Sequence, residues 1–256
     1  MEKLRKVKRS AQRRSGCRLR TQRKLLPALL MTMACLASFA QSGQAEGAPP
    51  PSPAGIREAS AEFDWYKTQF GTGLGNCGPA SAAMAAYWST GRDVSVEDVR
   101  EDIGEPNNSR AVSPDHLQAV LDAMGVPSRY VQLDSIGDMY AVIDSGGIAV
   151  LWIHTGWLTH AEGDTASTRI GRYYEDKCGH YVVLKGYTLD DRYFIVHDPI
   201  PGDWYTNEKL YPDGTMLGRD RYYAVEELWK SLKAQNVIVV ERTGERPETR
   251  STGAGG

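Results

Sequence analysis

The segment covering residues 76–89 constrains the fold of this chain most. It begins Asn-Cys-Gly-Pro-Ala-Ser and continues with alanines, a methionine, a tyrosine and a tryptophan. Proline is favoured in the first turn of a helix, where its missing N–H is not needed, and alanine and methionine are strong helix formers. The segment therefore predicts a helix over residues 77–89. Because alanines let neighbouring backbone approach closely, we expect this helix to be buried at the centre of the domain.

Cys77 lies in the first turn of this predicted helix. The positive end of a helix dipole and the unpaired N–H groups there lower the pKa of a thiol from about 8.5 to between roughly 3.5 and 7.5. The thiolate is the nucleophilic form of cysteine, so Cys77 is a candidate nucleophile. A free cysteine also serves as a small apolar core residue. On this segment alone, that alternative stays open.

The first 45 residues have the layout of a secretory signal peptide. Eleven lysines and arginines against one acid come first, and residues 25–40 are mostly apolar. The apolar stretch has the length of a signal-peptide core and is shorter than the roughly 20 residues that span a bilayer. We therefore expect cleavage after Ala40 or Ala45 and export to the periplasm, the cell surface or the medium, with no membrane span in the mature chain. An uncleaved anchor, or a lipid at Cys35, is the alternative.

Composition divides the rest of the chain into three parts. Residues 46–60 include a proline-rich stretch that suits an extended linker. Residues 243–256 lack an apolar cluster and predict a disordered tail. Residues 61–242 are enough for one domain with a sizeable core.

The charge of the chain argues against one class of partner. The whole chain carries a formal net charge of −2, and the first 45 residues carry +10, which leaves −12 for the remainder. A negative surface repels phosphate backbones. We therefore expect no nucleic-acid partner, and the sequence indicates no particular oligomeric state.

Helix signals come first in the domain and strand signals follow. Further helices are predicted to start after Ser95, Ser113 and Ser135, each a good N-cap residue. An order of helices followed by strands predicts an α+β domain with the helical part packed against an antiparallel sheet. The strand signals are short β-branched and aromatic runs at residues 148–154, 180–187, 193–198 and 237–241, with a hairpin turn at Asp190-Asp191.

The strands supply partners for Cys77. A cysteine nucleophile needs a base, and the base needs a third group that fixes its tautomer. His180 begins one apolar strand and the next strand ends at His197-Asp198-Pro199. Because hairpin strands place side chains next to each other, we choose His180 as the base and Asp198 as its orienting partner. His197 alternates to the opposite face and is expected to be structural or exposed, while a simple turn is the alternative for Asp198-Pro199.

Together these residues resemble the papain-like cysteine peptidases related to the bacteriocin-leader (double-glycine) peptidases, family thirty-nine, in a stand-alone secreted form. The resemblance implies a papain-like fold and a triad of Cys77, His180 and Asp198. In that family a glutamine before the cysteine helps the backbone N–H of the cysteine to hold the oxyanion, which implies this role for Gln69. The motifs that carry the resemblance are, in order, Gln69, residues 76–81, residues 179–187 and Asp198-Pro199.

The polar segment from residue 156 to residue 177 is long for a connection, and such segments are often binding loops or lids. Trp157, Tyr173 and Tyr174 are candidate substrate contacts within it. Arg169 and Arg172 belong to the same set. Filling a surface groove is an equally good interpretation of these side chains.

The cysteine count adds a redox hypothesis. With Cys17 and Cys35 in the predicted signal peptide, an exported protein keeps only Cys77 and Cys178. Two cysteines in an oxidising compartment favour a disulfide, so Cys178 is a candidate regulatory thiol that bonds Cys77 and switches the site off. A free structural thiol is the alternative. His180 and Cys178 could offer nitrogen and sulfur ligands, but the sequence has no second close ligand pair of zinc spacing, and we expect neither a metal nor another cofactor.

Three functions fit these observations. The first is a secreted cysteine peptidase that cuts a peptide or another amide bond through an acyl-enzyme at Cys77. The second is an acyl or peptidyl transferase on the same fold, in which an amine or thiol replaces water, as in phytochelatin synthases. The third is a catalytically silent peptide-binding module. The complete set of cysteine, histidine and aspartate favours an enzyme over the third, and the resemblance favours the peptidase.

Overall fold

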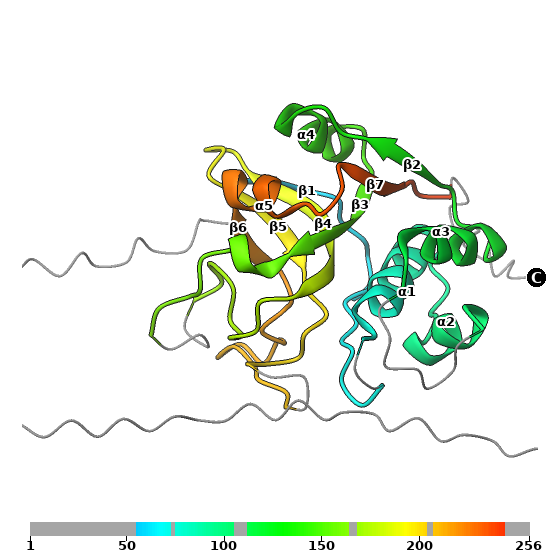
Figure 1. Ribbon diagram of the computed structural model, residues 1–256, viewed down its shortest axis with the longest axis horizontal. Helices are drawn as coiled ribbons and strands as arrows, with labels where there is room; N and C mark the ends of the chain where they lie inside the picture. The colour runs from blue at the N-terminus through cyan, green and yellow to red at the C-terminus, as the bar shows by residue number, and fades with distance from the viewer. Residues whose placement is uncertain (1–54, 73–74, 105–111, 164–167, 204–206, 244–256) are drawn as a thin grey trace, which may run out of the picture. The chain divides into compact units, whose positions relative to one another are not determined.

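A computed structural model describes residues 55–72, 75–104, 112–163, 168–203 and 207–243. The predicted signal peptide, most of the predicted linker and nearly all of the predicted tail lie outside these residues. The described part forms an α+β arrangement in which helices pack on an antiparallel sheet (Figure 1), as predicted.

The sheet has seven strands within the described residues, in the order β2-β7-β3-β4-β5-β6, and β1 pairs with β4 outside this path. All pairings between these strands are antiparallel. The central strand β4 is therefore flanked by β3 and β5, which places the predicted His180 strand in the middle of the sheet. The strands are β1 Ile56–Glu58, β2 Ser128–Gln132, β3 Ile148–His154, β4 Gly179–Thr188, β5 Tyr193–His197, β6 Arg221–Ala224 and β7 Asn236–Val240.

The predicted helices are all present, and three of them, α1, α2 and α3, gather on one side of the sheet (Figure 1). Ser95 begins α2 with a capping box and Ser113 caps α3 through its side chain, as the sequence signals indicated. The helices are α1 Cys77–Thr90, α2 Val96–Asp102, α3 Pro114–Ala123, α4 Ile136–Asp144 and α5 Val225–Ser231, with a short 3-10 helix η2 at Thr155–Trp157.

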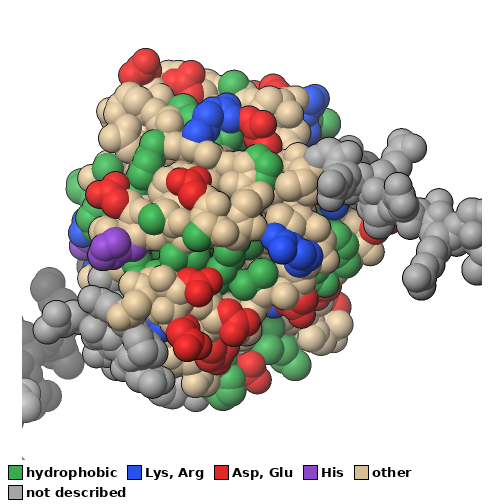
Figure 2. All heavy atoms as spheres, turned by 90° about the vertical axis from the view of Figure 1, so that its right-hand side faces the viewer, with side chains coloured by type: hydrophobic (Ala, Val, Ile, Leu, Met, Phe, Trp, Pro, Cys, Tyr) green, Lys and Arg blue, Asp and Glu red, His purple; other side chains and the backbone are tan. Residues whose placement is uncertain are grey.

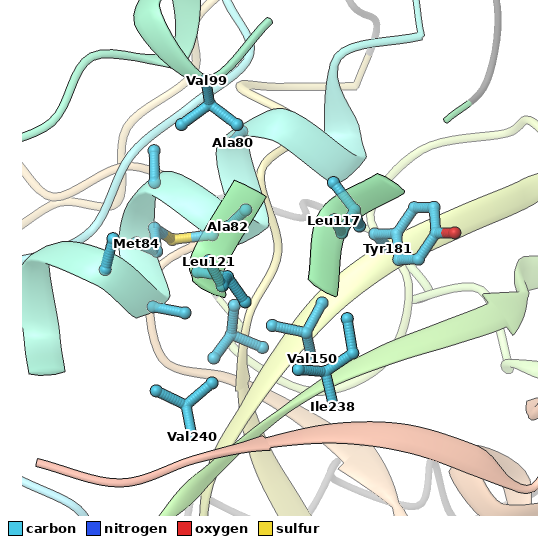
Figure 3. Packing of buried hydrophobic residues seen from close by; sticks show 14 of the residues in the cluster. Ala80, Ala82, Met84, Val99, Leu117, Leu121, Val150, Tyr181, Ile238 and Val240 are labelled. Carbon is cyan, nitrogen blue, oxygen red and sulfur yellow. The ribbon is translucent and has the colours of Figure 1, made fainter. Parts of the chain in front are cut away.

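The helix α1 is buried along nearly its whole length, because apolar side chains occupy all of its sides. Figure 3 shows Ala80 near Val99 of α2, and Leu117 and Leu121 of α3 on another side. Its side chains belong to one apolar cluster with residues of β3, β4 and β7. This packing fixes the first turn of α1, and with it Cys77, relative to β4.

The strand β4 separates two apolar clusters by the alternation of its side chains. Tyr181 and Val183 belong to the cluster that contains α1, whereas Val182 and Leu184 belong to a second cluster with residues of α4 and α5. A strand buried on both faces is a rigid support, and His180 is its second residue.

Three strands and one helix were not predicted. The sheet starts at Ile56, inside the segment predicted to be a linker, so the domain begins earlier than residue 61. Strand β1 is held by a close backbone approach to β4, since a Cβ at Gly186 would lie 2.6 Å from the carbonyl oxygen of Arg57. Strands of three or four residues, such as β1 and β6, give too little alternation to be seen in sequence, and β2 lacks a buried apolar run. The unpredicted elements are β1, β2, β6 and α5.

The side of the molecule at the right of Figure 1 faces the viewer in Figure 2. Acidic side chains gather on it, whereas basic side chains are few (Figure 2). The exposed acids of α2 contribute to this charge: Glu97, Asp98, Glu101 and Asp102. Within the described residues, no helix combines the length and the apolar character that crossing a membrane requires.

Arg221, the first residue of β6, is fully buried. Replacing Arg221 by methionine removes every donor of the guanidinium and leaves buried acceptors unpaired, so we expect the free energy of unfolding to fall by about 3 kcal/mol. Urea unfolding followed by tryptophan fluorescence measures this change. The acceptors are the carbonyl oxygens of Thr168 (2.6 Å), Ile170 (3.1 Å) and Gly171 (2.6 Å) and the hydroxyl of Tyr211 (2.8 Å).

Arg192 provides the matched control, because its side chain is half exposed, forms an ion pair with the half-exposed carboxylate of Asp190 and lies over the ring of Tyr193. Replacing Arg192 by methionine should leave the unfolding midpoint at the wild-type value. Equal losses in the two variants would show that the buried hydrogen bonds of Arg221 do not stabilise the fold.

Candidate active site

Cys77 is the first residue of α1 and is buried. The N-cap residue Asn76 does not cap the helix with its side chain. Instead, its amide donates to the carbonyl of Thr72 and accepts from Nε of Arg100 at 2.7 Å. The N–H groups of the first turn thus stay available, and the thiol of Cys77 is hydrogen-bonded by the backbone of Gly78.

His180 connects this thiol to Asp198. Its Nε2 lies 2.8 Å from Oδ1 of Asp198, and both side chains are buried. The imidazole also makes a side-chain hydrogen bond with Cys77. The three residues chosen from the sequence are therefore in one chain of hydrogen bonds, although they come from α1, β4 and the end of β5.

The pKa values of these groups favour a thiolate and imidazolium pair. Burial raises the pKa of the Cys77 thiol, but the hydrogen bond and charge of His180 and the backbone N–H groups outweigh it, so that the pKa is lowered. Burial lowers the pKa of His180, and the charge and hydrogen bond of Asp198 raise it well above its ordinary value. Cysteine at this position is thus poised as a nucleophile.

The carboxylate of Asp198 is fully buried and has four hydrogen-bond donors. Burial raises its pKa, but His180 and the other donors outweigh burial, and the pKa is lowered. A buried carboxylate with both oxygens satisfied stays ionised. Oδ1 accepts from His180 Nε2 at 2.8 Å and Ile200 N at 3.0 Å, and Oδ2 accepts from the hydroxyls of Tyr174 at 3.0 Å and Tyr223 at 2.6 Å.

Comparison with protein families decides the class of this chain. Residues 62–237 match the model of the Peptidase_C39 like family. The chain belongs to this family. The predicted class of activity, a cysteine-type peptidase, and the predicted resemblance are therefore confirmed. None of the curated proteins compared with the chain matched it.

Several solved structures resemble this C39-like peptidase. The peptidase domain of Streptococcus ComA, a bifunctional ABC transporter involved in quorum sensing, is 16% identical over 70% of this chain and 98% of that chain, with a TM-score of 0.44. A putative C39-like peptidase from Bacillus anthracis is 15% identical over 70% and 95%, with a TM-score of 0.47. A double glycine motif protease from an AMS/PCAT transporter, in complex with the leader peptide, is 15% identical over 73% and 99%, with a TM-score of 0.44.

Gln69 lies in a loop that the structure ties to the triad. Its N–H donates to the carbonyl of Pro199 at 2.9 Å, directly after Asp198, and its carbonyl accepts from the hydroxyl of Thr72 at 2.8 Å. The side chain is buried, and its Oε1 has no hydrogen-bond partner among the described residues. The loop thus joins the strand end of Asp198 to the segment that leads into Cys77. Its role as an oxyanion donor stays a prediction.

The structure corrects the prediction that Tyr173 and Tyr174 contact substrate. Both side chains are buried, with exposed fractions of 1% and 2%, in a third apolar cluster. Their hydroxyls face inward, because that of Tyr174 donates to the Asp198 carboxylate and that of Tyr173 donates to the carbonyl of Ile200. Trp157, at the end of η2, is 62% exposed, and its contact with substrate stays a prediction.

The described part of the segment 156–177 is not a loose lid. Its residue Arg172 is buried, and bridges join His160 to Arg172 and Ile170 to Tyr222 of β6. Tyr173 and Tyr174 are adjacent aromatic residues in a polar stretch, and nothing in the sequence indicated that their side chains point into the core.

Cys77 carries a free thiol in this structure, and Cys178, one residue before β4, is partly exposed. The disulfide between them is not formed here, and the redox switch stays a hypothesis. No group of His, Cys, Asp and Glu side chains in the described residues is large enough to hold a metal ion.

His197 is buried away from the triad, as the alternation along β5 indicated. Its ring lies 4.3 Å from that of Trp65, and its Nδ1 is 3.6 Å from the carboxylate of Asp220. Burial, together with the charge of Lys185, lowers its pKa well below the ordinary value. A neutral, buried histidine of this kind is a structural residue.

Two residues of the site were missed in the sequence. Tyr223 donates to Asp198, and the buried Arg100 donates to the carbonyl of Gly75 at 2.8 Å as well as to Asn76. The sequence did offer a signal for Arg100, because this arginine lies on the apolar side of α2 with Val96 and Val99. Nothing in the sequence of β6 indicates that Tyr223 is a hydrogen-bond partner of Asp198.

Proposed function

We propose that this chain hydrolyses peptide bonds with a triad of Cys77, His180 and Asp198 through a thioester at Cys77. One observation carries the proposal: the imidazole of His180 is hydrogen-bonded both to the thiol and, at 2.8 Å, to the buried carboxylate. A nucleophile, its base and the group that orients the base are the parts that acyl transfer requires.

The reaction then runs in two halves. The Cys77 thiolate attacks the carbonyl carbon of the substrate, and the imidazolium of His180 gives its proton to the leaving amine as the C–N bond breaks. Water next attacks the thioester while His180 takes up a proton from it, and the acid and the thiolate are released. Asp198 keeps the imidazole oriented and stabilises its charged form throughout.

The negative oxygen that forms in both halves needs donors. We assign this role to the backbone N–H of Cys77 and to the side-chain amide of Gln69, as the resemblance implied. The support is the position of the Gln69 loop, which is bonded to Pro199 next to the triad.

We further propose that the substrate is a peptide and that the enzyme acts outside the cytoplasm. One similar structure, the AMS/PCAT protease, contains a bound leader peptide, which is a property of that protein. Export rests on the signal-peptide layout of the first 45 residues alone. N-terminal sequencing of the protein released from its native host tests the cleavage site.

Digestion of a proteome-derived peptide mixture tests the proposed reaction. Reduced wild-type protein should produce new peptide ends, and a short incubation should leave part of Cys77 carrying an acyl mass. Cys77→Ala should produce neither, because the thiolate that forms the thioester is missing. New ends at equal rates in both proteins would contradict the proposal.

A further inference from the structure

The carboxylate of Asp198 has an unusual pair of donors. Two phenol hydroxyls, from Tyr174 and Tyr223, converge on Oδ2 at 3.0 Å and 2.6 Å, while Oδ1 is left for His180 and the backbone N–H of Ile200. The two tyrosines belong to different parts of the chain, since Tyr223 lies in β6 and Tyr174 lies in the segment before β4. All of these side chains are buried.

We infer that Tyr174 and Tyr223 are positioning residues that hold the Asp198 carboxylate ionised and turn its Oδ1 toward His180. The inference rests on the proposed function, because it deepens the role of Asp198 in the triad. A carboxylate can rotate about its bond to Cβ, and two donors on one oxygen fix that rotation. They also stabilise the negative charge that burial opposes.

The surroundings of Asp198 define what else could set its ionisation. The pKa values of both tyrosines are raised well above 10, chiefly by burial and next by Asp198, so the phenols remain protonated donors. The other titratable or charged groups near the carboxylate and its donors are His180 and, beyond it, Cys77; Tyr66 and Tyr173, whose hydroxyls reach the Asp198 carbonyl at 2.8 Å and 3.5 Å; and Arg221, 4.9 Å from the Tyr173 ring.

The sign of the pH effect follows from burial. Burial alone lowers the pKa of His180, and the ionised Asp198 raises it. The rate of alkylation falls at low pH where the Cys77 thiolate is protonated, and the imidazolium of His180 lowers the pKa of that thiol. The ionised Asp198 in turn keeps His180 protonated. Removing one phenol donor destabilises the ionised carboxylate, weakens its support of the imidazolium, and moves the acidic fall in the alkylation rate to higher pH.

The test is the rate of alkylation of Cys77 by iodoacetamide between pH 3 and pH 8, read by mass spectrometry of the Cys77 peptide. The alkylation rate falls toward low pH, and Tyr223→Phe and Tyr174→Phe should each move the midpoint of this fall up by about one pH unit. Tyr173→Phe is the matched control. It also loses a buried phenol, but one whose hydroxyl meets the backbone carbonyls of Ile200 and Asp198 and not the Asp198 carboxylate, so its midpoint should stay at the wild-type value.

A nearly isosteric variant guards against effects on folding. Tyr223→3-fluorotyrosine keeps the shape of the side chain and has a stronger phenol donor, so the midpoint should move to lower pH. An unchanged midpoint in the phenylalanine and fluorotyrosine variants, with Cys77 still activated, would overturn the inference. A wild-type Cys77 that reacts like an ordinary thiol at every pH would instead contradict the proposed function.

Discussion

Replacing His180 by alanine lowers kcat/KM for peptide hydrolysis by about 10³-fold, because the substitution removes both the proton donor to the leaving amine and the charge that lowers the pKa of Cys77. Burial then favours the neutral thiol, and among the groups that lower its pKa only the backbone hydrogen bonds of Tyr181 and Gly78 remain. The measurement is the initial rate of hydrolysis of a peptide found in the digestion experiment. The loss should be largest at acidic pH, where the thiolate depends most on the imidazolium.

His116 supplies the control for this substitution. It is exposed in the first turn of α3, and only its backbone N–H takes part in the cap of that helix. His116→Ala keeps that N–H and should retain full activity. A His180→Ala variant as active as His116→Ala would show that another group acts as the base.

A second large effect is expected at Gly218, which lies against the backbone of Asp198. The N–H of Asp198 donates to the carbonyl of Gly218 at 2.8 Å. A Cβ at residue 218 would lie 1.9 Å from the carbonyl oxygen of Asp198 and 2.6 Å from the hydroxyls of Tyr66 and Tyr173. No side chain fits these distances, so Gly218→Ala must displace Asp198 or the loop that holds it.

We expect Gly218→Ala to lower kcat/KM by about 10²-fold, because a catalytic group displaced by about 1 Å loses its productive geometry. Overpacking should also lower the free energy of unfolding by about 2 kcal/mol. Steady-state kinetics and urea unfolding measure the two effects. Gly55→Ala is the control, since a Cβ there meets no atom within 4 Å. Wild-type activity in Gly218→Ala would show that the position of Asp198 is not critical.

Local signals were sufficient for the elements that carry the proposed triad. The helix predicted over residues 77–89 is observed as Cys77–Thr90, and the strand predicted over residues 180–187 is β4. Proline in a first turn followed by alanines, and long runs of β-branched residues, are strong local preferences that the tertiary structure did not need to override. The hairpin turn at Asp190-Asp191 was found in the same way, and Asp191 adopts the positive φ of 56° that such a turn requires.

The contacts of Tyr174 and Tyr223 with Asp198 were not predictable from these signals, although the pairing of His180 with Asp198 was. Tyr174 was assigned to substrate because it lies within the long polar segment 156–177, yet its hydroxyl reaches Asp198, 24 positions away. Tyr223 lies 25 positions from Asp198 in a strand of four residues. Neither pairing leaves a periodic pattern, because each depends on the register of a short edge strand or on the path of a connection. The acids and bases of a site can thus be chosen by residue type, whereas the tyrosines that support them cannot.

The most direct test of the account is the alkylation of Cys77 by iodoacetamide at pH 6, followed by mass spectrometry, in reduced wild-type protein and in His180→Ala. The account predicts fast alkylation of Cys77 in the wild type and slow alkylation in the variant, since the thiolate depends on the imidazolium of His180. Slow alkylation at the same rate in both proteins would contradict it and would favour a peptide-binding module without catalysis.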